Sequence, residues 1–343
     1  MDQLQTAASM LLTSDVDAPF VVLLMVTWNS MGYLPEAIGS VLAQTYRKFG
    51  VVVIDNGSTD GSWQYLQSIA AVDGRFRIVR EKTNLGLARA LNRGLPLCEG
   101  RWIARFDPDD RALPDRLERQ LEFVAAHPEI KATSSFAYYI DGDGRRIGAT
   151  YSDLLTERDF DRYRAANEPF MLLHPGALID RQTLVELGGY RDEFTPAEDI
   201  DLWERISDRG LVLVQPEHLM EYRIHAGSTI SHRHTAARLK QEWAVACARA
   251  RRHRQPEPGW EAFLRDWESA PAWERLHRRR RILSALLSRR GREHLAARRR
   301  FDGMARLALA GMLRPAYTAP RIRGHLPAVF NRFGLGSTAR VAR

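Results

Sequence analysis

The chain contains little cysteine: Cys98 and Cys247 are its two cysteines, and they lie far apart in the sequence. Two thiols without CxxC spacing argue against a disulfide framework and against a structural zinc site. Long hydrophobic runs are missing as well, since no apolar segment approaches the roughly 20 residues that a membrane-spanning helix needs. A reducing compartment, here the cytoplasm, is therefore the expected location.

Signals for targeting and for common nucleotide-binding loops are also absent. Residues 1–19 lack the basic start and the apolar centre of a secretion signal, and we expect them to form a flexible N-terminal arm. No GxGxxG sequence follows the first predicted strand, which weakens a dinucleotide-binding interpretation, and no GxxxxGKS or GxxxxGKT sequence supports a P-loop NTPase. With 45% hydrophobic and 27% charged residues, the composition is nevertheless that of a globular protein.

Acidic residues are scarce in the last third of the chain. Residues 232–343 hold 26 Lys and Arg but 8 Asp and Glu, a net charge of +18, whereas the whole chain carries +8. Such an excess predicts an anionic partner for this region. Because Arg278–Arg281 and Arg298–Arg300 alternate with Leu, Ile and Ala, the pattern is typical of basic amphipathic helices on an anionic membrane. A solvated helical face is the alternative that the sequence leaves open.

Short apolar segments alternate with helical patterns in the first half of the chain. This alternation predicts an α/β fold with a doubly wound, mostly parallel sheet and helices on both faces. We expect one globular domain over residues 20–231 and a basic, mainly helical appendage over residues 232–343. Ser30 is predicted to cap the first helix, and residues 211–215 and 219–225 are predicted as two short strands. The first four predicted strands are Pro19–Val26, Val51–Asp55, Arg75–Arg80 and Arg101–Asp107.

Polar side chains follow these strands, where open α/β sheets bind ligands. Asp107 and Asp109 stand two residues apart after the fourth strand. Two carboxylates at this spacing can share one Mg²⁺ or Mn²⁺ ion, which in turn can hold a diphosphate. An acidic turn that caps the next helix is the alternative. The other polar side chains at strand ends are Thr27, Asn29, Asp55, Asn56, Lys82 and Asp110.

Six segments, in this order, resemble the motifs of family 2 inverting glycosyltransferases of the GT-A fold. The resemblance is to enzymes such as bacterial polysaccharide and O-antigen sugar transferases, and it covers roughly residues 20–231. The segments are VTWNSMGYLPEAIGSVLAQTYRKFGVVVIDNGSTDGS, KTNLGLARALNRG, IARFDPDDRALPDRLE, HPGALID, AEDIDLWERI and YRIHAGSTIS.

The resemblance implies a metal-dependent transfer of a sugar, with inversion, from a nucleotide-diphosphate sugar to an acceptor hydroxyl. It makes Asp199 the general base that takes the proton of that hydroxyl. It makes Asp109 a ligand of Mn²⁺ or Mg²⁺, with His225 as a further ligand. It places Thr27, Asn29, Asp55, Lys82, Arg89 and Asp107 around the nucleotide. It places His174, Glu198 and Trp203 near the donor sugar or the acceptor.

The same resemblance implies the partners. UDP is the expected nucleotide, with thymidine and guanosine donors left open, and the acceptor is expected to be a glycan or a lipid-linked saccharide. The resemblance does not cover the basic helices of residues 232–343; their charge and apolar pattern predict peripheral attachment to the inner face of the cell membrane, and no nucleic acid is expected.

Two other classes of protein remain as alternatives. A sugar-phosphate nucleotidyltransferase shares the sheet and the metal-binding acids, but the start of the chain lacks the glycine-rich basic loop for a triphosphate. A non-catalytic scaffold with a nucleic-acid-binding tail conflicts with the complete set of metal and base positions.

Overall fold

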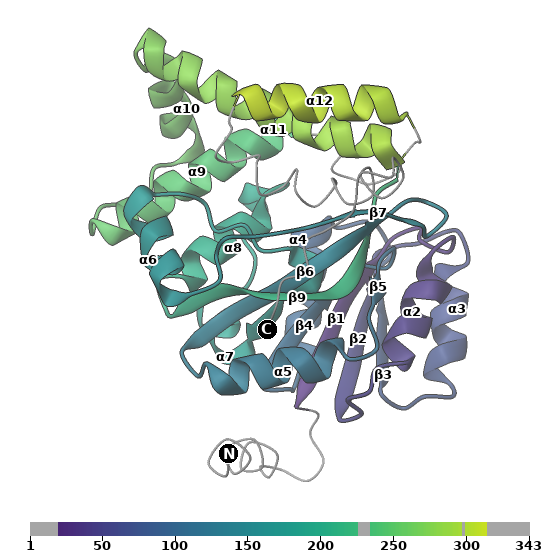
Figure 1. Cartoon of the computed structure of the whole chain (residues 1–343). Helices are drawn as coiled ribbons and strands as arrows, with labels where there is room; N and C mark the ends of the chain where they lie inside the picture. Colours follow the sequence, from purple (N-terminus) through teal and green to yellow (C-terminus); the bar gives the residue numbers. More distant parts are fainter. Residues whose placement is uncertain (1–19, 226–233, 297–298, 314–343) are drawn as a thin grey trace, which may run out of the picture.

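The computed structural model describes residues 20–225, 234–296 and 299–313 (Figure 1). The predicted N-terminal arm and Arg298 lie outside the described residues, as does the segment that follows His225 in the sixth motif. Within the described residues, the core is one mixed sheet of nine strands with helices around it.

The first half of the sheet is parallel, in the order β3-β2-β1-β4. Every residue of β1 is buried, because helices cover both faces of this part of the sheet, and its continuous apolar sequence reflects that burial. Figure 1 shows α5 in front of the strands and α4 behind them. The elements are β1 (Val21–Thr27), α2 (Leu34–Leu42), β2 (Phe49–Asp55), α3 (Ser62–Ala70), β3 (Phe76–Arg80), α4 (Leu87–Gly94), β4 (Trp102–Phe106) and α5 (Arg116–Ala126).

The second half of the sheet continues from β4 in the order β8-β6-β9-β5, with β7 on the side of β6. Strand β8 is antiparallel to both of its neighbours, whereas β6 and β9 are parallel. The α/β class and the helical appendage predicted from the sequence are confirmed. The elements are β5 (Arg111–Ala112), β6 (Ile130–Ile140), β7 (Arg146–Ala149), α6 (Glu157–Ala166), β8 (Leu178–Asp180), α7 (Arg181–Glu186), α8 (Glu198–Ile206) and β9 (Leu211–Arg223).

Two local predictions were wrong. The two short strands form the single strand β9, because a register shift from Ser135 opposite Gln215 to Phe136 opposite His218 leaves Pro216 outside the ladder. Proline has no N–H for a ladder, and such a bulge accommodates it without ending the strand. Ser30 does not cap α2 with its side chain; instead, its carbonyl oxygen accepts hydrogen bonds from the N–H groups of Tyr33 and Leu34.

The C-terminal helices lie beyond the carboxyl ends of the parallel strands (Figure 1). Helix α9 packs on the core, where the rings of Trp243 and Phe194 stack with centroids 3.9 Å apart. Helices α11 and α12 form a hairpin with very close backbones: a Cβ on Gly303 would lie 2.9 Å from the carbonyl oxygen of Gly291. None of the described helices is long and apolar enough to cross a membrane. The four helices are α9 (His234–Arg252), α10 (Trp260–Ser269), α11 (Ala272–Ala296) and α12 (Arg300–Leu313).

Candidate active site

Two buried polar atoms lie side by side at the ends of β1 and β2. Thr27 and Asp55 are partners in the parallel register, and both side chains are fully buried. Neither Thr27 Oγ1 nor Asp55 Oδ2 has a hydrogen-bond partner among the described residues. Buried polar atoms rarely lack hydrogen bonds. Two such atoms at neighbouring strand ends therefore point to a ligand that supplies the missing partners.

Asn29 and Asn56 hold the loops around this pair. Asn29 adopts a left-handed backbone conformation with φ 49°, and its side-chain oxygen accepts a hydrogen bond from the Thr59 N–H at 2.8 Å. The Asn56 side chain bonds to Asn84 and to the Leu85 N–H. The loop after β3 is thereby tied to the ends of β1 and β2.

A basic side chain that the sequence analysis missed stands beside Asp55. Arg80, the last residue of β3, is the register partner of Asp55, and its Nε lies 3.4 Å from Asp55 Oδ2. Its guanidinium also lies over the ring of Trp63 and donates to the Ser58 carbonyl oxygen. The signal available in the sequence was its place at a strand end, next to the predicted Lys82.

The two predicted basic residues differ in their surroundings. Lys82 is exposed in the loop after β3, close in sequence to Arg80. Arg89 does not meet Asp55: its guanidinium pairs with Asp192 at 2.7 Å, in the segment just before α8. The structure therefore places Arg89 on the side of Glu198.

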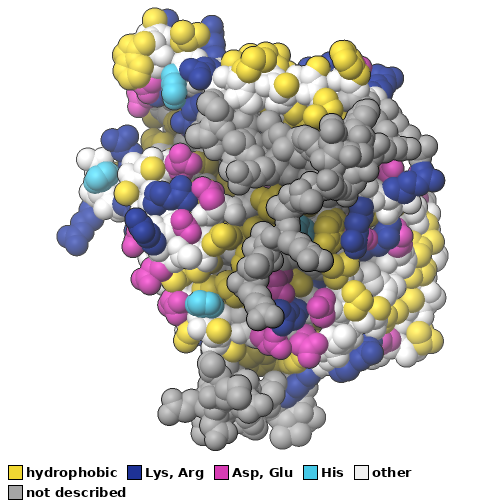
Figure 2. Space-filling view, in the orientation of Figure 1, with side chains coloured by type: hydrophobic (Ala, Val, Ile, Leu, Met, Phe, Trp, Pro, Cys, Tyr) yellow, Lys and Arg dark blue, Asp and Glu magenta, His cyan; other side chains and the backbone are white. Residues whose placement is uncertain are grey.

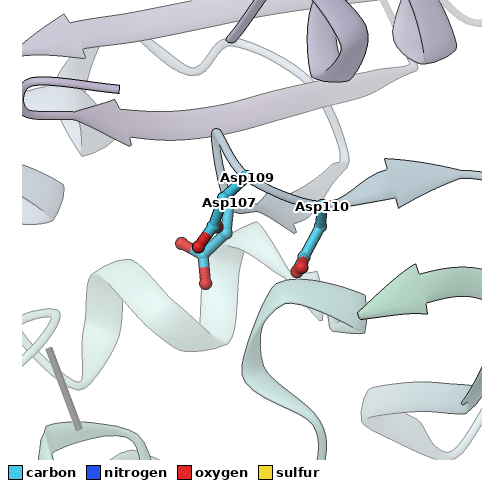
Figure 3. Close-up of side chains that lie close together, drawn as sticks. All are labelled: Asp107, Asp109 and Asp110. Atoms are coloured by element: carbon cyan, nitrogen blue, oxygen red, sulfur yellow. The ribbon is translucent and has the colours of Figure 1, made fainter. Parts of the chain in front are cut away.

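The acidic turn after β4 gathers three carboxylates. Asp107, Asp109 and Asp110 each place an oxygen within 4.8 Å of the others. Figure 3 shows their side chains pointing to the same side of the turn. Burial, together with the neighbouring carboxylates, raises the pKa of Asp110 well above its usual range and also raises that of Asp107. Asp110 Oδ2 is buried without a hydrogen-bond partner among the described residues.

These residues fit a hard divalent cation. Carboxylate oxygens are the ligands that Mg²⁺ and Mn²⁺ prefer, and a cation would relieve the repulsion that raises the pKa values. His225 lies at the same place, with its Nε2 2.9 Å from Asp109 Oδ2. The structure thus brings His225 to the pair Asp107 and Asp109, which lies more than a hundred residues earlier in the sequence.

Arg223, the last residue of β9, holds this acidic turn through several hydrogen bonds. Its guanidinium donates to the carbonyl oxygens of Asp109, Asp141 and Gly142 and pairs with Glu36. Its backbone N–H donates to Asp110 Oδ1 at 2.8 Å. Because Arg223 ends β9, it also sets the position of His225 two residues later. Sequence analysis had quoted this residue only as part of a motif.

Arg105 is the buried charge at the centre of the site. It lies on β4, its side chain is 1% exposed, and it donates to Asp107 Oδ1 at 2.5 Å. Its positive charge counteracts the rise in pKa of Asp107 and Asp110, and likewise of Glu198 and Asp199. The acidic turn and the start of α8 therefore lie around one guanidinium. Sequence analysis missed Arg105 because it stands inside an apolar strand.

Glu198 and Asp199 open α8 as two adjacent carboxylates. Burial, and then the charge of Glu198, raises the pKa of Asp199 to about 7. Burial also raises the pKa of Glu198, whose Oε2 has no hydrogen-bond partner among the described residues. Asp199 is partly exposed, whereas Glu198 is buried. A partly exposed carboxylate with a pKa near neutrality has the properties of a general base.

His174 closes the site from the side of β8. Its Nε2 lies 2.9 Å from the hydroxyl of Tyr190, and burial, which disfavours the charged ring, lowers its pKa well below the usual range. The ring of Trp203 meets it edge to face, with centroids 5.9 Å apart. Trp203 is fully buried beside His174, and its Nε1 has no hydrogen-bond partner among the described residues.

Replacing Arg105 by Met should destabilise the fold in a pH-dependent way. Removing one partner of a buried charge cluster costs about 3 kcal/mol of unfolding free energy, and this loss is expected at pH 8. The loss of unfolding free energy should be smaller at pH 5. The Asp199 carboxyl group, with a pKa of about 7, is then protonated and has no charge for Arg105 to stabilise. Denaturant unfolding at both pH values measures it.

The matched control for this experiment is Arg89→Met. Its ion pair with Asp192 is exposed, so the expected loss is below about 1 kcal/mol at either pH. An equal loss for Arg105→Met at pH 5 and pH 8 would show that the charge of Asp199 does not contribute to the cost of removing Arg105.

The fold and the acidic groups at the strand ends are those of a GT-A glycosyltransferase. Residues 22–186 match the family model for glycosyl transferase family 2. The chain belongs to this family.

Curated relatives agree with the family. The chain is 32% identical over 195 residues to the putative glycosyltransferase EpsE of Bacillus subtilis, covering 56% of this chain and 68% of EpsE. It is 28% identical over 240 residues to an uncharacterized glycosyltransferase of Haemophilus influenzae, covering 66% and 73%. It is 26% identical over 228 residues to the putative teichuronic acid biosynthesis glycosyltransferase TuaG of B. subtilis, covering 66% and 87%.

Solved structures share the fold. S. aureus TarS, in complex with UDP-GlcNAc, has a TM-score of 0.52 at 16% identity, and the match covers 94% of both chains. The mannosyltransferase PcManGT of Pyrobaculum calidifontis, in complex with GDP-Man and Mn²⁺, has a TM-score of 0.51 at 19% identity, covering 98% of this chain and 88% of that one.

Proposed function

We propose that the protein transfers a hexosyl residue, with inversion, from a nucleoside diphosphate sugar to a hydroxyl group of a glycan or a lipid-linked saccharide. One observation carries this proposal: a cluster of three carboxylates and the Glu198–Asp199 pair both interact with the buried guanidinium of Arg105. The three carboxylates suit a divalent cation that binds the diphosphate of the donor. The Glu198–Asp199 pair suits removal of a proton from the acceptor. TarS in complex with UDP-GlcNAc and PcManGT in complex with GDP-Man support the donor class.

The nucleotide is proposed to bind at the ends of β1 and β2. Asp55 Oδ2 can accept a hydrogen bond from a base N–H or a ribose hydroxyl, and Thr27 Oγ1 can donate one or accept one. Arg80 and Lys82 add positive charge beside them, and Asn29 holds the loop. UDP is proposed as the nucleotide. Arg89 is left out because it pairs with Asp192.

Asp107, Asp109 and His225 are proposed to hold Mn²⁺ or Mg²⁺. When bound there, the ion supplies Lewis-acid stabilisation of the negative charge on the leaving diphosphate. Asp110 and Arg223 keep the turn in place through the hydrogen bonds already described. PcManGT, described with Mn²⁺, supports this choice of metal.

Asp199 is proposed to remove the acceptor proton. Its pKa of about 7 leaves a large fraction ionised at neutral pH while keeping it basic enough to accept a proton. The acceptor oxygen forms a bond to the anomeric carbon as the bond to the diphosphate oxygen breaks on the opposite face, so the configuration inverts. Glu198 raises the basicity of Asp199, and His174 is proposed to border the donor sugar.

A panel of nucleotide sugars with Mn²⁺ or Mg²⁺ tests the function. We expect one donor to raise the thermal unfolding temperature in a metal-dependent way and to release nucleoside diphosphate when an acceptor is present. A parallel assay with nucleoside triphosphates and sugar phosphates follows pyrophosphate. Release of pyrophosphate without use of any nucleotide sugar would favour a nucleotidyltransferase, and no response to any donor would favour a non-catalytic scaffold.

A further inference from the structure

The helical hairpin of α11 and α12 presents an apolar surface to solvent. Among the described residues, ten large hydrophobic side chains are exposed, and six of them lie on these two helices. Phe301 and Trp273 are 87% and 72% exposed. We call these six residues the hairpin surface: Trp273, Leu276, Leu283, Phe301, Leu309 and Met312.

The hairpin surface is not needed for packing between the two helices. Their contact uses other residues, because Gly291 and Gly303 bring the backbones together and Leu307 is buried at 4% exposure. The Ser284 hydroxyl donates to the Ala310 carbonyl oxygen across the contact. On α12, the apolar residues therefore point outward as well as inward. A helix at a water-exposed surface usually has a polar outer face, so an apolar one marks an interaction site.

The charge around this surface is positive. Helix α11 contains eight Arg and two Glu. Arg278 and Arg281 pair with Glu274 and Glu242, whereas Arg279 and Arg290 are exposed. Figure 2 shows hydrophobic and basic side chains together along the hairpin at the top of the molecule. Exposed arginines can bind anionic headgroups, and exposed aromatic and aliphatic side chains can enter the apolar layer beneath them. The combination is therefore typical of a protein surface that binds an anionic bilayer.

The hairpin also lies near the acidic site. Burial and the charge of Asp110 raise the pKa of the Tyr222 phenol, and the charge of Arg289 on α11 lowers it. Tyr222 precedes Arg223, the residue that holds the acidic turn. Figure 1 shows the hairpin beyond the carboxyl ends of the strands. A partner that binds the hairpin therefore lies on the same side of the protein as the proposed donor and acceptor sites.

We propose that the hairpin surface docks the protein on an anionic lipid bilayer. Phe301, Leu309 and Met312 enter the headgroup region, and Arg279 and Arg290 contact lipid phosphates. Docking itself is independent of sugar transfer; that it brings a lipid-linked acceptor to Asp199 rests on the proposed function. The hydrophobic component favours a bilayer over nucleic acid, because phosphate backbones alone do not require exposed Phe and Met side chains.

Vesicle flotation with the full chain tests docking without any donor or acceptor. The probes are vesicles of phosphatidylcholine alone and vesicles with about one third phosphatidylglycerol. We expect the protein to float with the anionic vesicles at low salt, to float far less at high salt, and to stay at the bottom with phosphatidylcholine alone. Failure to float with anionic vesicles at low salt would overturn the proposal and leave the proposed function intact.

Two pairs of variants separate the apolar and the basic contributions. Phe301→Ser with Met312→Ser should weaken binding to anionic vesicles about tenfold or more, because less apolar area is buried. The matched control Val72→Ser with Val185→Ser removes exposed apolar groups elsewhere and should bind as the wild type does. Arg279→Gln with Arg290→Gln should weaken binding about tenfold and reduce its salt dependence, while Lys48→Gln with Arg158→Gln should not.

Two results would overturn the proposal as stated. If only the Arg variants lose binding to anionic vesicles, the contact with lipid is electrostatic alone, and the entry of Phe301, Leu309 and Met312 into the headgroup region is wrong. If sedimentation shows a dimer that Phe301→Ser with Met312→Ser dissociates, and flotation is unchanged in that variant, the surface joins two copies of the chain. Nucleoside diphosphate release with a water-soluble acceptor should be unchanged in all of these variants, which shows that they remain folded.

Discussion

Asp199→Asn should lower kcat about a thousandfold and leave donor binding close to that of the wild type. The Asn side chain keeps the shape of Asp199 and its hydrogen bond with the Ile200 N–H, but it cannot take a proton from the acceptor. General-base catalysis contributes typically about 10²- to 10⁴-fold, which sets this expectation. The measurements are steady-state nucleoside diphosphate release and the thermal shift with donor and metal.

The control variant is Glu193→Gln, which neutralises an exposed acid six residues before Asp199. It should keep the activity of the wild type. The Asn variant should be no less stable than the wild type at pH 8, because burial disfavours the ionised Asp199 carboxylate in the fold. A large loss of stability, or of donor binding, would mean that Asp199 has a structural role.

The role of Asp199 as the base also predicts how kcat of the wild type depends on pH. The base must be ionised, and its folded pKa is raised to about 7, so kcat should rise with pH through about 7 and then level off. In the Asn variant, the residual rate should lose this rise. A wild-type profile that is flat between pH 5 and pH 8 would exclude Asp199 as the base.

Asp109→Asn should remove the metal dependence of donor binding and lower turnover by at least about a hundredfold. Changes in residues that only support a metal ligand already cost about 10- to 100-fold, and loss of a ligand should cost no less. The direct measurement is Mn²⁺ titration by calorimetry in the absence of donor, followed by the same titration with donor present.

Asp115→Asn is the matched control, since this exposed acid begins α5 without making a side-chain cap. It should bind Mn²⁺ as the wild type does. The charge of Asp109 raises the pKa values of Asp107 and Asp110, so the Asp109→Asn change should lower both. Unchanged Mn²⁺ affinity in Asp109→Asn would move the metal away from this turn.

The parallel half of the sheet was predictable from the sequence because its signals are local. Continuous apolar strands such as Val51–Asp55, separated by helical patterns, indicate strands that are buried on both faces. The same order fixes which end of each strand carries Thr27, Asp55 and Asp107, and right-handed connections bring those ends to one edge. The family resemblance then assigned chemistry to positions that the strand order had already gathered.

Tertiary structure alone decided how the charges inside the site are paired. Arg223 holds Asp109 and Asp110, which lie more than a hundred residues earlier, and its guanidinium also pairs with Glu36. No local pattern encodes such pairs, because they depend on β9 joining β5 and β6 in the second half of the sheet.

The outward face of the hairpin was likewise decided in three dimensions. The sequence indicated basic helices with apolar residues between the arginines. Which of those residues are buried depends on the close approach of Gly291 and Gly303, which turns Leu307 inward and leaves Phe301 and Met312 in solvent. The composition and the spacing of apolar residues determined the fold class and the placement of acids at strand ends, because both depend on residues that are close in the sequence. Packing between distant segments determined the central guanidinium and the exposed apolar surface, because burial is a property of the folded chain.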